Sequence, residues 1–301
     1  MKIKKAVIPA AGLGTRVLPA SKSVPKEMLN IVDKPAIQYI VEEAAAAGIE
    51  DILIITNRGK GVMEDHFDHS YELEDQLSKN PAKKDIYDVV KATADIANVY
   101  FVRQKETKGL GHAILRAKPF IGNEPFAILY GDDVIVNYDG HPVTKQLVDT
   151  YEKYGKGVVG VKEVPRKDVQ KYCTLDITDI GGGLMDVHKI IEKPREDQIM
   201  SCFSILGRVI APPCVFDYLE EDLARTPEGT ELYFTDTLSR LAGEGRLMAQ
   251  DFDGIRYDMG NKLGIMKANC EIALKHPEIG ADFKEYIKKP VSYTHLTLPT
   301  T

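Results

Sequence analysis

Short, nearly continuous apolar runs alternate with segments of helical periodicity along the first half of the chain. Such runs are typical of strands that are buried on both faces of a sheet, whereas the intervening segments have the spacing of amphipathic helices. Strand–helix–strand alternation predicts a mostly parallel sheet that is covered by helices on both faces. The predicted strands are 5–9, 52–56, 98–102, 126–130 and 157–164, and the predicted helices are 36–47, 109–117 and 143–154.

The pattern changes in the second half of the chain. Segments 172–178 and 184–192 flank three consecutive glycines at 181–183, which predicts a β-hairpin. Segment 204–210 is predicted to be one more strand, and the charged, helical segment 72–95 is interpreted as an insertion on the outside of the fold. The remaining predicted elements are helices at 215–225, 235–243, 261–275 and 283–288.

The pattern shows neither a linker nor an internal repeat, which favours one compact α/β domain over residues 1–290. Pro290 follows an amphipathic helical segment and is expected to end that helix. Residues 291–301 contain no Asp, Glu, Lys or Arg and are rich in Thr, Leu and Pro. We therefore interpret them as a disordered or non-native tail that takes no part in a site.

Composition and charge exclude several classes of function. The chain has 301 residues, 44% hydrophobic and 28% charged, which is normal for a globular protein with a core. Its net charge of −6 argues against nucleic-acid binding, so a phosphate-bearing ligand needs a local cluster of cations. No apolar run is long enough for a membrane span or a signal peptide. The four cysteines lack metal-binding spacing, which favours reduced thiols and a cytoplasmic location.

The strongest chemical signal is the loop P-A-A-G-L-G-T-R at residues 9–16, directly after the first predicted strand. Glycines at a strand end let the backbone approach a ligand closely, and free N–H groups there accept an anion. A dinucleotide-binding turn, as in a nicotinamide oxidoreductase, would place a third glycine at position 17, where this chain has Val17. Arg16 and Lys26 can together clamp a triphosphate, Arg16 through its planar fork and Lys26 as a point charge.

The loop is one of several motifs that occur together in a known family. G-L-G-T-R at 12–16, followed by P-K-E-M at 25–28, resembles the signature of the sugar-nucleotide pyrophosphorylases. Further matches, in the family's order, are D-K-P at 33–35, K-G-L-G-H-A at 108–113, G-D-D at 131–133, E-K-P at 192–194 and Y-D-M-G-N-K-L-G at 257–264. The resemblance covers residues 2–289 and is closest to the bacterial uridylyltransferase branch. It implies a three-layer αβα, Rossmann-like nucleotidyltransferase fold with a mixed, mostly parallel sheet.

The resemblance also implies roles for individual residues. The implied catalytic residues are Arg16, Lys26, Asp132 and Lys193, and Mg²⁺ would be held by Asp132 and Asp258. The implied nucleotide contacts are Ala10, Ala11, Gly12, Gly14, Thr15, Arg16, Lys26, Gln104 and Gly109, with the Gln104 amide reading the base. The implied sugar-phosphate contacts are Tyr172, Cys173, Glu192 and Lys193. Two carboxylates, completed by phosphate oxygens and water, suit Mg²⁺.

Each of these residues also has a plain structural interpretation. Without the family motifs, Asp132 and Asp258 are typical turn residues, and Glu192 with Lys193 fits an exposed ion pair at a strand end. Pro194 favours an extended backbone at Lys193, which would aim the side chain. We interpret His112 as a structural histidine, because the implied chemistry needs no general base.

The implied reaction is in-line attack by the phosphate oxygen of glucose 1-phosphate on the α-phosphorus of UTP, which releases pyrophosphate. A phosphate oxygen is already ionised near neutral pH, so catalysis consists of positioning and charge neutralisation. The chain departs from the family pattern at Cys173, Cys202 and Tyr233, which bear on the identity of the sugar.

Two alternatives remain open on the sequence. One is an enzyme that uses dTTP or another sugar 1-phosphate, and the other is a non-catalytic sugar-nucleotide-binding protein. Loss of Arg16, Lys26 or the aspartate pair would favour the second alternative, but all four residues are present. The helical C-terminal segments lead us to expect a homo-oligomer, either a dimer or a tetramer.

Overall fold

A nine-stranded sheet forms the centre of the computed structural model, which describes residues 2–293. Its strand order is β5-β4-β1-β6-β11-β8-β12-β10-β9. The strands are β1 (Lys5–Pro9), β4 (Asp51–Thr56), β5 (Asn98–Arg103), β6 (Phe126–Leu129), β8 (Gly157–Glu163), β9 (Cys173–Gly181), β10 (Leu184–Glu192), β11 (Phe203–Ala211) and β12 (Leu247–Asp251). All of them except β10 and β11 run in one direction. The predicted mixed, mostly parallel sheet is therefore confirmed.

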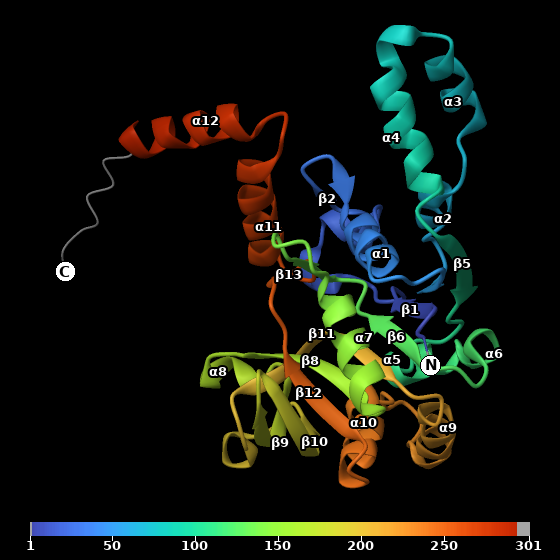
Figure 1. Cartoon of the computed structure of the whole chain (residues 1–301), viewed down its shortest axis with the longest axis vertical. Coiled ribbons are helices and arrows are strands. Elements are labelled where there is room, and N and C mark those ends of the chain that lie inside the picture. The colour runs from blue at the N-terminus through green and yellow to red at the C-terminus, as the bar shows by residue number, and fades with distance from the viewer. Residues whose placement is uncertain (1, 294–301) are drawn as a thin grey trace.

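Helices cover both faces of this sheet, which gives the predicted three layers (Figure 1). Neighbouring side chains of β1 point to opposite faces, so Ile8 belongs to one hydrophobic cluster and Val7 to the other. The first cluster packs under α1 (Ala36–Ala46) and α7 (Val143–Tyr154). The second packs under α5 (Leu110–Leu115), α9 (Val215–Arg225) and α10 (Phe234–Gly243). No helix within residues 2–293 is both long and apolar enough to cross a membrane.

A second, two-stranded sheet carries part of the candidate site. It pairs β7 (Asp133–Val136) with β13 (Ile255–Asp258), so that Asp258 lies opposite Asp133. The prediction that the chain after residue 210 is mainly helical is wrong for β12 and β13. These strands are short, and what fixes them is pairing with β8 and β7, which lie far away in sequence.

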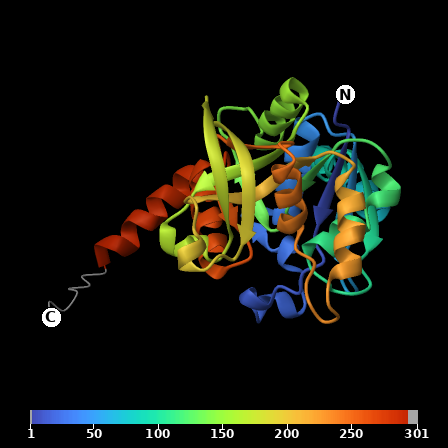
Figure 2. The same ribbon diagram turned by 90° about the horizontal axis from the view of Figure 1, so that it is seen from below.

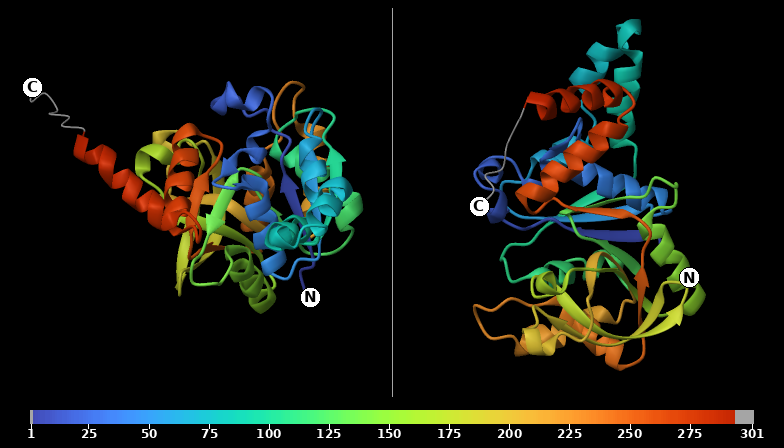
Figure 3. Two further views of the ribbon diagram at one scale, coloured as in Figure 1. Left: turned by 90° about the horizontal axis from the view of Figure 1, so that it is seen from above. Right: turned by 90° about the vertical axis from the view of Figure 1, so that its left-hand side faces the viewer.

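The charged segment 72–95 is an external insertion, as predicted. It contains α3 (Tyr71–Ser78) and α4 (Lys84–Ala94), and the two helices pack on each other. Most of their side chains are exposed. They form an arm that projects from the body of the molecule (Figures 1 and 3). Helix α2 (Val62–Phe67) lies at the base of this arm and buries Met63 and Phe67 in the first hydrophobic cluster.

The C-terminal helix differs from its prediction. After α11 (Lys262–Lys275), helix α12 spans Gly280–Tyr293 and includes Pro290, which was expected to end it. A proline removes one N–H group and crowds the preceding turn, but this disfavours helix continuation without forbidding it. Helix α12 packs on α11 and extends away from the central sheet (Figure 2). The proposed tail at 291–301 falls largely outside the described residues, which end at Tyr293.

Removal of residues 291–301 is expected to leave the melting temperature and the steady-state kinetics unchanged. Every residue implied in the site lies between Ala10 and Asp258, and the terminal helix packs mainly on its neighbour α11. Chain ends that are not held by packing tolerate removal. Thermal melting, gel filtration and initial rates of the truncated protein test this expectation. A melting temperature lower by several degrees, or a changed elution volume, would show that this segment packs.

Candidate active site

The glycine-rich loop follows β1 at the edge where the parallel strands end, which is where α/β proteins place ligands. Ala10 donates its N–H to the Ile55 carbonyl at 2.8 Å, which ties the loop to β4. Gly14 has φ +66° and precedes a short 3₁₀ helix, Thr15–Val17, which carries Arg16. A Cβ on Gly12 would lie 3.6 Å from the Lys26 Nζ atom. The loop backbone and the Lys26 ammonium therefore face one another.

Arg16, Lys26 and Asp132 meet beyond the ends of β1 and β6. The Lys26 Nζ atom pairs with Asp132 Oδ2, and Arg16 Nη2 lies 4.0 Å from the same oxygen. Burial lowers the pKa of Lys26, but the Asp132 and Glu27 carboxylates outweigh it and raise the pKa overall. Burial raises the pKa of Asp132, but Lys26 and Arg16 outweigh it and lower the pKa overall. Both groups are therefore charged at neutral pH.

Asp258 reaches the same place from β13. A Cβ on Gly260 would lie 2.8 Å from Asp258 Oδ1, 2.9 Å from Asp132 Oδ2 and 2.6 Å from Arg16 Nη2. A side chain at position 260 would push these three charged groups apart, whereas glycine lets them converge. Among the described residues there is no group of three or more His, Cys, Asp and Glu side chains that could hold a metal. Two carboxylates alone fit Mg²⁺, which takes its remaining ligands from water and substrate phosphates.

A buried ion pair lies behind the two aspartates, and the sequence did not point to it. Arg256 Nη2 lies 2.5 Å from Asp133 Oδ1, and its guanidinium carbon lies 5.4 Å from the centre of the Tyr172 ring. Burial raises the pKa of Asp133 to about 6, against the pull of Arg256. The only available signal was the alternation in β13, which places Arg256 on the same side as Asp258.

A cavity of about 410 Å³ adjoins the loop and gathers most of the residues implied in nucleotide binding. Its lining includes Ala11, Gly12, Thr15, Lys26, Gln104 and Gly109. The Nε2 group of buried Gln104 donates to the Gly109 carbonyl at 3.2 Å and lies 3.0 Å from His112 Nδ1. His112 thus holds the Gln104 amide in place. Gly109 has φ +90°, and a Cβ there would lie 2.8 Å from the Leu232 carbonyl oxygen, so this position requires glycine.

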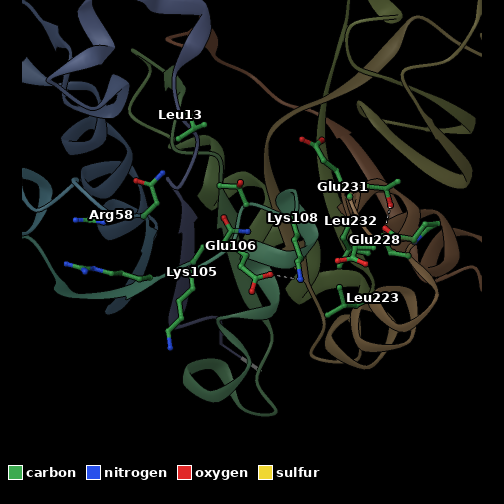
Figure 4. A pocket seen from close by; sticks show the side chains of 17 residues that line it. Leu13, Arg58, Lys105, Glu106, Lys108, Leu223, Glu228, Glu231 and Leu232 are labelled. Atoms are coloured by element: carbon green, nitrogen blue, oxygen red, sulfur yellow. Dashed lines mark hydrogen bonds and ion pairs between the residues drawn. The ribbon is translucent and has the colours of Figure 1, made fainter.

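A larger cavity of about 1250 Å³ continues outward from the nucleotide cavity. The two cavities share Leu13, Gln104, Thr107 and Glu231 in their linings. Figure 4 shows Arg58 and Lys105 on one side of the larger cavity, and Glu228, Glu231 and Leu232 on the other. The nucleotide cavity is therefore open to solvent along this side.

The residues implied in sugar-phosphate binding line a smaller cavity of about 230 Å³, which shares Leu110 and Glu231 with the nucleotide cavity. They are Tyr172, Cys173, Glu192 and Lys193, joined there by Tyr233. Lys193 Nζ lies 5.0 Å from the centre of the Tyr233 ring, a cation–π contact that the sequence did not reveal. Burial raises the pKa of Glu192.

The backbone at Lys193 is not extended, which contradicts the expectation from Pro194. Its φ is +45°, in the left-handed region that residues other than glycine rarely adopt. The Lys193 N–H donates to the Tyr172 carbonyl at 2.7 Å, and this bond at the end of the hairpin overrides the local preference. Strained backbone of this kind persists only where the surroundings hold it, and it is frequent at functional sites.

Cys173, one of the departures from the family pattern, has an unstrained backbone. It begins β9 and does not have positive φ. Its side chain is buried in the hydrophobic core, where Sγ accepts the Ile205 N–H at 3.4 Å. Burial raises the pKa of this thiol to about 12. The thiol is therefore a core group, and Cys173 can reach a ligand in the cavity only through its backbone.

Comparisons with known proteins show the family to which this chain belongs. The model of the nucleotidyl transferase family matches residues 5–275. A UTP–glucose-1-phosphate uridylyltransferase of Staphylococcus epidermidis is 50% identical over 288 residues, which are 96% of this chain and 98% of that protein. The structure of a UDP-glucose pyrophosphorylase complexed with UDP-glucose is similar at 38% identity and a TM-score of 0.82, over 91% of this chain and 100% of that one. A UTP-bound UGPase from Acinetobacter baumannii is similar at 36% identity and a TM-score of 0.86, over 95% and 99% of the two chains. The chain belongs to the nucleotidyl transferase family.

Proposed function

We propose that the protein transfers a uridylyl group from UTP to glucose 1-phosphate, giving UDP-glucose and pyrophosphate. One observation carries this proposal. The nucleotide cavity and the sugar cavity meet, sharing Leu110 and Glu231, and each contains a lysine, Lys26 or Lys193. Two phosphate-bearing substrates can therefore lie side by side. The activities named for the relatives support the same assignment.

In the proposed mechanism the protein positions two anions and neutralises their charge. Lys193 would hold the phosphate of the sugar so that its oxygen faces the α-phosphorus of UTP in line with the leaving pyrophosphate. Lys26 and the N–H groups of the glycine-rich loop would accept the nucleotide phosphates, and Arg16 would hold the pyrophosphate as it departs. Charge-assisted contacts of this kind contribute most where the transition state spreads charge over phosphate oxygens. The attacking oxygen carries no proton to remove, so His112 can remain structural.

We further propose that Asp132 and Asp258 hold Mg²⁺, with the remaining ligands from water and UTP. Bound there, the ion would neutralise charge on the phosphate oxygens. The convergence of the two carboxylates at Gly260 supports this assignment.

UTP is expected to be preferred over dTTP. The buried Gln104 amide can read the pyrimidine edge, and the methyl group of thymine must fit beside it. One additional methyl group discriminates only about 10–200-fold, so some use of dTTP is expected. Pyrophosphate release measured across four nucleoside triphosphates gives the ratio of kcat/KM values directly. A higher kcat/KM for dTTP would identify a thymidylyltransferase instead.

The same assay addresses the sugar and the non-catalytic alternative. Glucose 1-phosphate should give the highest kcat/KM among several sugar 1-phosphates, despite the departures at Cys173, Cys202 and Tyr233. UTP binding without pyrophosphate release from any substrate pair would instead indicate a non-catalytic sugar-nucleotide-binding protein.

We also propose that the protein acts in the cytoplasm as a homo-oligomer, a dimer or a tetramer, with no nucleic-acid or membrane partner. The unpaired state of its four cysteines supports a reducing compartment. The projecting arm and helix α12 offer surfaces for self-association (Figure 1). Light scattering of the purified protein determines the number of subunits.

A further inference from the structure

A lysine and a glutamate are buried together beneath the glycine-rich loop. The Lys60 side chain is 7% exposed and that of Glu27 is 1% exposed, and their Nζ and Oε2 atoms lie 2.8 Å apart. Glu27 Oε1 has no hydrogen-bond partner among the described residues. A buried ion pair is often less stabilising than apolar side chains of similar volume, and an unpaired buried oxygen adds a further cost. Stability alone therefore gives no reason for this pair.

The pair contacts the backbone that would bind the triphosphate. Lys60 Nζ also donates to the Ala10 carbonyl, and Asn57 Nδ2 donates to the Ala11 carbonyl at 2.5 Å. Both side chains come from the turn that follows β4. Neither the carbonyl of Ala10 nor that of Ala11 is therefore free to rotate.

Because the peptide group is planar, these contacts to the carbonyls also fix the direction of the N–H groups that face the ligand. In a trans peptide the C=O group and the next N–H group point in opposite directions. Fixing the Ala10 carbonyl thus fixes the Ala11 N–H, and fixing the Ala11 carbonyl fixes the Gly12 N–H. Ala11 and Gly12 line the nucleotide cavity, and Lys60 lies buried behind them. Asn57 holds the Ala11 carbonyl from the lining of the adjoining larger cavity.

Glu27 acts on the same site from the other side. It follows Lys26 in the 3₁₀ helix Lys26–Met28, so its ion pair with Lys60 anchors the backbone from which the Lys26 side chain extends. One buried pair thus connects the two elements that face each other across the nucleotide cavity.

We propose that Glu27 and Lys60 are positioning residues that fix the glycine-rich loop and Lys26 in the geometry required by the triphosphate of UTP, with Asn57 as their auxiliary. The inference rests on the proposed function, because it assigns a role within that site. It predicts an effect on UTP that does not extend to the sugar phosphate.

The test compares the double variant Glu27→Gln/Lys60→Met with the control Lys5→Met/Glu124→Gln. The control removes a more exposed lysine–glutamate pair at the other end of β1, where Lys5 Nζ lies 2.6 Å from Glu124 and 3.2 Å from the Phe120 carbonyl. The double variant leaves no buried charge unpaired, which protects folding. We expect its kcat/KM for UTP to fall about 10–100-fold, because small misplacements in a site cost this much, while the KM for glucose 1-phosphate stays unchanged. The control should keep both parameters.

Three outcomes are decisive. No pyrophosphate release by the wild-type protein would overturn the proposed function. An active wild type together with a folded double variant of unchanged kcat/KM for UTP would overturn the positioning role. If the double variant does not fold, the variant Asn57→Ala tests the inference instead. It removes only the side-chain amide that donates to the Ala11 carbonyl. A several-fold rise in the KM for UTP is expected from that variant, and an unchanged KM would overturn the inference.

Discussion

Replacing Asp132 or Asp258 with asparagine is expected to lower kcat about a thousandfold. Asparagine keeps the size of the side chain but removes the negative charge, and a metal ion in such a site contributes several kcal/mol to the transition state. Each 1.4 kcal/mol corresponds to about a factor of ten in rate. Asp132→Asn should be the more severe of the two, because it also removes the carboxylate that keeps buried Lys26 charged.

The measurement is the rate of pyrophosphate release as a function of Mg²⁺ concentration for the wild type, both single variants and the double variant. Because the two carboxylates would act on one ion, the double variant should lose little more than the worse single variant. The matched control is Asp186→Asn. Asp186 lies on β10 and forms a partly exposed ion pair with Lys156, so this variant should keep wild-type kinetics. Full turnover of the wild type in excess EDTA would refute the role of the metal.

The sequence predicted the fold wherever local pattern and tertiary packing agree. β1 and α7 have their predicted bounds because their apolar positions repeat at the period of the element they form. β7, β12 and β13 were missed, since each depends on a partner strand that no local window contains. Pro290 was read as a helix stop, whereas proline only disfavours the conformation that α12 retains there.

Some residues of the candidate site could likewise be predicted from the sequence, and others could not. The place of the loop that carries Arg16 followed from its position at the end of the first parallel strand, where α/β sheets bind ligands. Asp132 was singled out only by the family motif G-D-D. The buried charges Glu27 and Lys60 could not be recognised, because a charged residue that will be buried has the same local signature as a surface one. For Arg256 the alternation in β13 was the only signal. At Lys193 a local rule gave a wrong prediction. Pro194 favours an extended backbone at the preceding residue, but the backbone of Lys193 is left-handed.

Replacing Arg16 with alanine is expected to lower kcat/KM at least about a hundredfold with little effect on stability. The Arg16 side chain is 65% exposed and lies 4.0 Å from Asp132, so its loss removes no buried contact, and surface substitutions usually change stability by less than about 0.5 kcal/mol. In the substrate complex the same guanidinium would hold the departing pyrophosphate, where a desolvated, charge-assisted contact is worth a few kcal/mol. The effect on rate and the effect on folding are thus predicted to separate.

The variant Arg16→Lys separates the contribution of the planar guanidinium group from that of the positive charge. A lysine keeps the positive charge near Gly260 but cannot make the paired, parallel hydrogen bonds that a guanidinium offers to two phosphate oxygens. We therefore expect Arg16→Lys to recover only part of the activity that Arg16→Ala loses. Initial rates at varied UTP, together with thermal melting of all three proteins, provide the comparison. An alanine variant that melts and turns over like the wild type would remove Arg16 from the mechanism and leave the triphosphate to Lys26 and the loop backbone.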